Sequence, residues 1–272
     1  MALFTHASGQ YLVKDDARIY YETAGNPNGF PLLLLHGGLG NLTDFNSIIS
    51  PLIPHFQLIA LDFRGHGKST IGNRPLTYQV YQDDVEALLA YLNIIQYAVI
   101  GFSDGGVTAY RLASSKTSPQ ASKVKAMVAI AAHPIISPSD FIFPLLNDMT
   151  SQKWRTKFPE PVSYYERVNA EPDFDGLVQQ VVTLWTGHKT SQYPGKAIKH
   201  IQAPTLLVRG ELDPLFSHQL MEDIQHIIKG AQIHTIEGAG HEAHQDNPLK
   251  FIQKVKAYLL ENTQLMDQEA AC

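Results

Sequence analysis

Short apolar runs recur along the chain and alternate with segments in which apolar residues are spaced three or four apart. The runs are typical of strands buried on both faces of a parallel sheet, and the spaced segments are typical of helices that bury one face. Such alternation predicts an α/β fold, with a mostly parallel sheet flanked by helices. The predicted strands are 11–13, 18–22, 31–35, 56–61, 97–100, 124–131, 205–208 and 232–236, and the predicted helices are 42–53, 78–92, 107–113, 217–228 and 248–260.

One segment, residues 134–199, breaks this alternation. It holds much of the proline and aromatic content and has helical fragments, but no run of the buried-strand kind. Because ordered domains rarely carry about 60 residues without structure, we predict an inserted, mainly helical cap. The core is then formed by residues 1–133 and 200–262, and a polar tail, 263–272, is expected to be mobile.

Composition narrows the class of protein. The chain has 272 residues, of which 44% are hydrophobic and 17% charged, which indicates a globular protein. A net charge of −5 and the absence of a Lys/Arg-rich run argue against a nucleic-acid partner. The single cysteine, Cys272, excludes a disulfide within the chain. No secretory signal or membrane-length apolar run is seen, so we expect a cytoplasmic protein with a small-molecule substrate and no membrane partner; a homodimer is left open.

The sequence Gly101-Phe102-Ser103-Asp104-Gly105 stands between a predicted strand and a predicted helix. A strand that turns at once into a helix forces its central residue into a strained conformation, and its neighbours must lack side chains to avoid a collision. Ser103 would therefore be held out at the edge of the sheet as a nucleophile. The pattern alone is common in glycine-rich turns, so its meaning depends on whether a base, an acid and an oxyanion site accompany it.

A serine hydroxyl needs a histidine base near neutral pH, and the histidine needs a carboxylate to fix its tautomer. Asp213 comes just after the predicted strand 205–208, and His241 comes just after the next strand. Since the carboxyl ends of parallel strands meet at one edge of the sheet, both residues are expected at the edge where ligands bind in such folds. Glu211 is an alternative acid. His244 is an alternative base, although it lacks the Gly-x-Gly that precedes His241.

With these motifs the chain resembles the α/β-hydrolase family over about residues 11–260. The resemblance implies that Ser103 is the nucleophile, Asp213 the orienting acid and His241 the general base and acid. It implies no cofactor and no metal. The motifs that carry it are His36-Gly37-Gly38, Asp62 to Ser69, Gly101 to Gly105, Gly210 to Asp213 and Gly238 to His241.

An oxyanion site needs N–H donors that point at the developing negative charge. One donor is expected to be the amide that follows the nucleophile, that of Asp104. The resemblance assigns the second to Gly38, in the loop after the strand 31–35, with Leu39 as the alternative. His36 in the same loop is interpreted as a structural brace.

Two other motifs fail on spacing. A phosphate-binding loop that ends in Gly67-Lys68-Ser69 would need glycine at position 62, where Asp62 stands. His241 and His244 lie three residues apart, whereas the zinc-protease pattern needs four. No metal site is predicted.

The predicted activity is hydrolysis of a small carboxylic ester through an acyl-enzyme. The same triad serves C–C bond hydrolases, lactonases, aminopeptidases and perhydrolases in this family, and a non-catalytic binding protein is a further alternative. Leu39, Asp104 and Trp185 are candidate substrate contacts. Asp104 has two interpretations: a carboxylate in the first helical turn that complements the helix dipole, or a partner for a substrate amine.

Overall fold

The computed structural model describes residues 3–115, 123–187 and 190–269. These residues form one eight-stranded sheet in the order β1-β2-β4-β3-β5-β6-β7-β8. The first pairings, β1 with β2 and β2 with β4, are antiparallel, and all later pairings are parallel. The strands are Gln10–Lys14 (β1), Ala17–Gly25 (β2), Phe30–Leu35 (β3), Phe56–Leu61 (β4), Tyr97–Phe102 (β5), Val124–Ile130 (β6), Thr205–Gly210 (β7) and Gln232–Ile236 (β8). The predicted α/β fold is confirmed.

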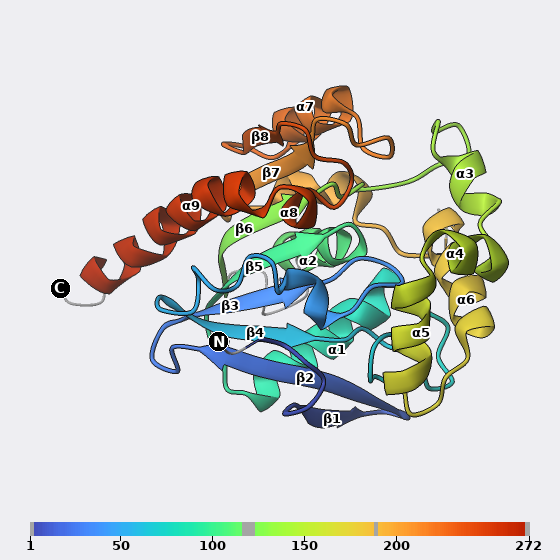
Figure 1. Cartoon of the computed structure of the whole chain (residues 1–272). Coiled ribbons are helices and arrows are strands. Elements are labelled where there is room, and N and C mark those ends of the chain that lie inside the picture. Colours follow the sequence, from blue (N-terminus) through green and yellow to red (C-terminus); the bar gives the residue numbers. More distant parts are fainter. Residues whose placement is uncertain (1–2, 116–122, 188–189, 270–272) are drawn as a thin grey trace.

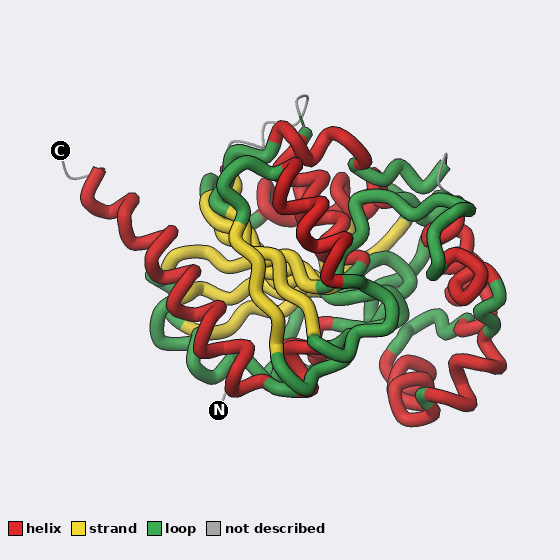
Figure 2. The backbone as a smooth tube through the Cα atoms, turned by 90° about the horizontal axis from the view of Figure 1, so that it is seen from above, coloured by secondary structure: helices red, strands yellow, loops and turns green. Residues whose placement is uncertain are grey.

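Helices flank the sheet on both sides (Figure 2). They are Tyr78–Tyr91 (α1), Asp104–Ser114 (α2), Phe143–Asn147 (α3), Ser151–Lys157 (α4), Pro159–Val168 (α5), Phe174–Thr186 (α6), His218–Ile227 (α7), Ala243–Asp246 (α8) and Pro248–Glu269 (α9), together with the 3₁₀ helices Leu42–Phe45 (η1) and Gly195–His200 (η3). In β3, the four leucines from Leu32 to Leu35 are fully buried. The central strands are therefore covered on both faces, as their unbroken apolar runs predicted.

Helices α3 to α6 all come from the inserted segment, which we define as residues 134–199. They lie together at one end of the molecule (Figure 1), separate from the helices that flank the sheet. Their helical character agrees with the prediction from the sequence.

The predicted helix over 42–53 is wrong. Only η1 forms, and turns follow it in which Ile48 N donates to Phe45 O and Leu52 N donates to Ile49 O, at 3.0 and 2.9 Å. Most of the apolar residues of this segment are nonetheless fully buried, namely Leu42, Phe45, Ile48, Ile49 and Leu52. Successive i→i+3 turns place residues three apart on one side just as an α-helix does, so the apolar spacing does not distinguish the two.

The C-terminal end also differs from expectation. Helix α9 continues to Glu269, past the expected core boundary at 262 and through most of the predicted tail. Cys272 lies outside the described residues.

Candidate active site

Ser103 lies in the strained turn that the glycine pattern predicts. It joins β5 to α2 with φ 49° and ψ −113°, and its amide donates to Ile130 O at 2.8 Å. A Cβ on Gly101 would lie 2.4 Å from Gly105 O, and one on Gly105 would lie 2.0 Å from Leu35 O. These contacts are with backbone atoms, so only glycine fits at either position.

The candidate acid and base meet at adjacent strand ends. Asp213 follows β7 and His241 follows β8, and His241 Nδ1 lies 2.9 Å from Asp213 Oδ2. The other oxygen, Asp213 Oδ1, accepts from the amides of Leu215 at 2.8 Å and Phe216 at 3.2 Å. An Nδ1–H that donates to Asp213 leaves His241 Nε2 as the proton acceptor.

His241 lies beside the strained turn that carries Ser103. Its ring centroid is 5.0 Å from that of Phe102, the residue before Ser103. It is also close enough to Asp104, the residue after Ser103, to lower the pKa of that carboxyl. Within the described residues, no hydrogen bond joins Ser103 Oγ to His241; such bonds are often long in unliganded sites and tighten with substrate.

The alternative acid and base are placed differently. The Glu211 carboxylate accepts from Gly238 N at 2.9 Å. His244 is fully buried, and neither of its ring nitrogens has a hydrogen-bond partner among the described residues. Its ring lies 4.8 to 6.0 Å from the rings of Phe45, Phe102 and Phe251. Glu211 thus braces a loop, and His244 is packed in the core. As candidate acid and base, the geometry favours Asp213 and His241, which contact each other.

The loop after β3 is held by two polar anchors. His36 Nε2 accepts from Phe63 N at 2.9 Å, so its Nδ1–H donates to Gly37 O at 2.7 Å. Burial lowers the pKa of His36 to about 4, which keeps the ring neutral. Further along, Asn41 and Asp44 cap η1, and Asn41 N donates to Asp44 Oδ2 at 3.0 Å. His36 therefore braces the loop as expected.

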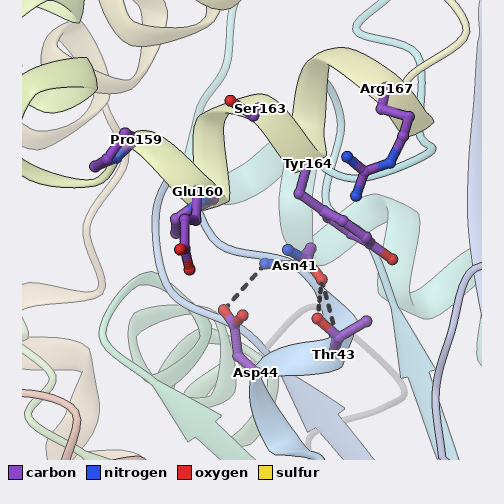
Figure 3. Close-up of a pocket in the computed structure, with 9 residues that line it drawn as sticks. Asn41, Thr43, Asp44, Pro159, Glu160, Ser163, Tyr164 and Arg167 are labelled. Atoms are coloured by element: carbon purple, nitrogen blue, oxygen red, sulfur yellow. Dashed lines mark hydrogen bonds between the residues drawn. The ribbon is translucent and has the colours of Figure 1, made fainter.

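A surface pocket of about 550 Å³ lies next to this loop, between η1 and α5 (Figure 3). Asn41, Thr43 and Asp44 face Glu160 and Tyr164 across it. None of the predicted site residues lines it. The site predicted from the sequence and this pocket are therefore separate features of the surface.

The two expected oxyanion residues lie next to each other. A Cβ added to Gly38 would lie 2.5 Å from Asp104 Oδ2 and 2.7 Å from Trp185 Cζ2. Asp104 is the first residue of α2, so its amide has no carbonyl partner within the helix. Leu39 follows with φ 61°, a left-handed conformation at the tip of the loop.

The Asp104 side chain is 3% exposed and has partners that the sequence did not indicate. Tyr78 OH donates to Oδ1 at 2.8 Å, and Trp185 Nε1 lies 3.0 Å from both carboxylate oxygens. Burial raises the pKa of Asp104 to about 6, although both hydrogen bonds act to lower it. The carboxylate thus does more than complement the dipole of α2. Tyr78 lies on α1, 26 positions earlier, and no local motif marks the pairing.

Other features bear on the class of site. Within the described residues, no group of three His, Cys, Asp or Glu side chains is placed to hold a metal ion. No described helix is both long and apolar enough to cross a membrane.

The sheet order, the strained serine turn and the Asp–His pair at adjacent strand ends define an α/β hydrolase. The chain belongs to the alpha/beta hydrolase family, whose model matches residues 32–254. It is similar to Esterase YbfF of Escherichia coli (strain K12), 26% identical over 255 residues that cover 88% of this chain and 96% of that protein. It is also similar to Serine hydrolase BPHL of Mus musculus, 27% identical over 257 residues that cover 89% and 82% of the two chains.

Among solved structures, a putative lipase (lip1) from Acinetobacter baumannii AYE shares the fold, with a TM-score of 0.77 and 18% identity over 94% of this chain and 92% of that one. The chain is a hydrolase, as the sequence predicted.

The buried ring of His244 predicts a pH-dependent stability. Burial lowers its pKa to about 3, well below the 6.5 of an exposed histidine. Below pH 6.5 the unfolded chain therefore binds a proton that the folded chain does not, and stability falls by about 1.4 kcal/mol per pH unit. His244→Phe removes this group. We expect urea unfolding to show that the stability of the wild type relative to His244→Phe drops by about 1.6 kcal/mol between pH 6.5 and 5. A difference that is constant over this range would contradict the account.

Proposed function

We propose that this hydrolase cleaves small carboxylic esters through a Ser103–His241–Asp213 triad and a covalent acyl-enzyme. The observation that carries the proposal is the 2.9 Å contact between His241 Nδ1 and Asp213 Oδ2, beside a serine held at φ 49°. The similarity to an esterase and a serine hydrolase over most of their lengths supports the same class of reaction.

The reaction begins when Ser103 Oγ attacks the ester carbonyl carbon and His241 Nε2 takes the hydroxyl proton. The tetrahedral intermediate collapses, the C–O bond to the alcohol breaks, and His241 returns the proton to the leaving alkoxide. Water then attacks the acyl-enzyme with His241 again as base, which releases the acid and restores Ser103. Asp213 stays ionised and stabilises the imidazolium in both halves.

The negative oxygen of each tetrahedral intermediate would be bound by the amides of Gly38 and Asp104. Two features support this role. The Asp104 amide is unpaired within the first turn of α2, where the helix dipole favours negative charge. The loop that carries Gly38 is braced by His36 and by the cap at Asn41, so a donor in this loop needs little reorganisation during the reaction.

The ring of Trp185, in contact with Gly38, offers an apolar wall for the acyl or alcohol group, and Leu39 lies at the tip of the same loop. A small uncharged ester suits such a wall. Lactones, peptides, C–C substrates and perhydrolysis use the same nucleophile, and substrate profiling separates them.

A panel of substrates tests the proposal. p-Nitrophenyl acetate and butyrate, a γ-lactone, an aminoacyl p-nitroanilide and a vinylogous 1,5-diketone are compared by kcat/KM, with hydrogen peroxide added in a separate arm. We expect the p-nitrophenyl esters to exceed the other substrates by at least about tenfold, a difference of about 1.4 kcal/mol in activation free energy. A higher kcat/KM for the lactone, the anilide or the diketone would reassign the reaction.

A further inference from the structure

Asp104 is a buried carboxylate whose hydrogen bonds come from neutral donors, Tyr78 OH at 2.8 Å and Trp185 Nε1 at 3.0 Å. Burying a charge is costly unless hydrogen bonds compensate it. A carboxylate also forms stronger hydrogen bonds with N–H and O–H donors than a neutral side chain does. The charged Asp104 carboxylate therefore binds Tyr78 and Trp185 more strongly than a neutral side chain at this position would.

The two donors come from different parts of the fold. Tyr78 begins α1 in the core, and Trp185 lies near the end of α6 in the inserted segment. Trp185 is held a second time, because Tyr193 OH donates to its carbonyl oxygen at 3.0 Å, and the Tyr193 hydroxyl lies 3.3 Å from that of Tyr78. The end of α6 is thus tied through its indole to Asp104, the residue that follows Ser103, and its backbone is held by Tyr193.

The indole also lies over the second oxyanion residue. A Cβ on Gly38 would meet Trp185 Cζ2 at 2.7 Å and Nε1 at 3.1 Å. Trp185 is 7% exposed. The indole therefore contacts both residues whose amides are proposed as oxyanion donors, and a shift of α6 would open that side of the site.

We propose that Asp104 is a positioning residue whose carboxylate holds Trp185 against Gly38, so that helix α6 closes the oxyanion site. This inference rests on the proposed function, because the site is defined by the reaction at Ser103. It gives the Asp104 side chain a role apart from that of its amide. It also differs from amine binding, since Tyr78 and Trp185 already donate to the carboxylate that a substrate amine would need.

Kinetics of single and double variants test the hold on Trp185. Asp104→Asn retains one acceptor for Tyr78 but presents an NH₂ group to the indole, and Trp185→Phe removes the indole donor. Each is expected to lower kcat/KM for p-nitrophenyl acetate by about tenfold, the scale of one charge-assisted hydrogen bond. Because both changes remove the same contact, the double variant should also lose about tenfold, against about 100-fold for independent sites.

Helix α1 offers a matched pair of tyrosines. Tyr78→Phe removes the donor to Asp104 and should lower kcat/KM by about three- to tenfold. Tyr81→Phe removes a fully buried hydroxyl that has no hydrogen-bond partner within the described residues, and its kcat/KM should stay within about twofold. Equal effects of the two substitutions would overturn the proposal.

Fluorescence tests the contact without turnover. The chain has two tryptophans, so Trp154→Phe leaves Trp185 as the reporter. Since burial raises the pKa of Asp104 to about 6, Trp185 emission should titrate with a midpoint near pH 6, and the transition should vanish when Asp104→Asn is added. The other ionisable groups that face Asp104 are Tyr78 and Tyr81 of α1, Tyr193 and His241, and all remain in that variant.

The outcomes separate the two proposals. A titration that depends on Asp104 in a protein without esterase activity would refute the proposed function and leave the contact intact. A titration that persists in Asp104→Asn, or additive losses in the double variant, would refute the positioning role. A preference for free-amine over N-acylated esters that Asp104→Asn abolishes would replace it with amine binding.

Discussion

Replacing Ser103 with alanine is expected to lower kcat/KM for p-nitrophenyl acetate by about 10⁴- to 10⁶-fold. Alanine removes the oxygen that forms the acyl-enzyme, and no other hydroxyl occupies the strained turn between β5 and α2. The residual rate would come from binding and from the oxyanion donors, which remain. Steady-state kinetics on the purified variant measure the effect.

The Ser103→Ala variant needs a control which shows that it is still folded. The substituted alanine must adopt the same positive φ as Ser103 (49°), so thermal unfolding has to show that the variant is folded under the assay conditions. A folded Ser103→Ala protein that keeps more than about a hundredth of the wild-type kcat/KM would contradict the assignment of the nucleophile.

Replacing Asp213 with asparagine is expected to reduce kcat by about 10⁴-fold. The carboxylate accepts from His241 Nδ1 at 2.9 Å and is held by the amides of Leu215 and Phe216. An asparagine whose NH₂ group faces His241 favours the tautomer with the proton on Nε2, which cannot accept the proton of Ser103. The histidine also loses the charge that stabilises its protonated form.

The neighbouring carboxylate supplies the matched control. Glu211 lies two residues earlier and accepts from Gly238 N, so Glu211→Gln should keep kcat within about threefold, as for a substitution outside the reacting groups. A large loss in Glu211→Gln together with near-normal kcat in Asp213→Asn would make Glu211 the acid. Measuring both variants at the same pH decides between them.

Most of the scaffold was predictable because its signals are local. Buried parallel strands are continuous apolar runs, and each of those predicted is present within a few residues of its expected bounds. The order of Ser103, Asp213 and His241 along the chain, each just past a strand end, also predicted that Asp213 and His241 would meet. Parallel topology favours this, because it brings consecutive strand ends to one edge of the sheet, and β7 and β8 are neighbours there.

The segment after Gly40 was mispredicted because its apolar spacing fits two structures. Residues 42–53 bury most of their apolar side chains through i→i+3 turns after η1, and spacing alone could not exclude an α-helix. The end of α9 was placed too early for a related reason. Most of its last residues are polar, and a mostly polar sequence is compatible with a helix as well as with a tail.

The surroundings of Asp104 lay beyond the reach of sequence patterns. Its partners, Tyr78 and Trp185, come from α1 and α6, 26 and 81 positions away. Asp104, the residue after Ser103, had two interpretations from the sequence, but its partners depend on how the inserted segment packs against the core. Contacts across such long separations leave no periodic or local motif to find.

Covalent labelling tests the central claim most directly. The folded protein is treated with a fluorophosphonate, digested, and examined by mass spectrometry for the modified residue. The triad predicts a single adduct on Ser103 that forms rapidly in the wild type, at least about 100-fold more slowly in His241→Ala because the general base is lost, and not at all in Ser103→Ala. No adduct on Ser103 in folded wild-type protein, or an adduct on another residue alone, would contradict the account.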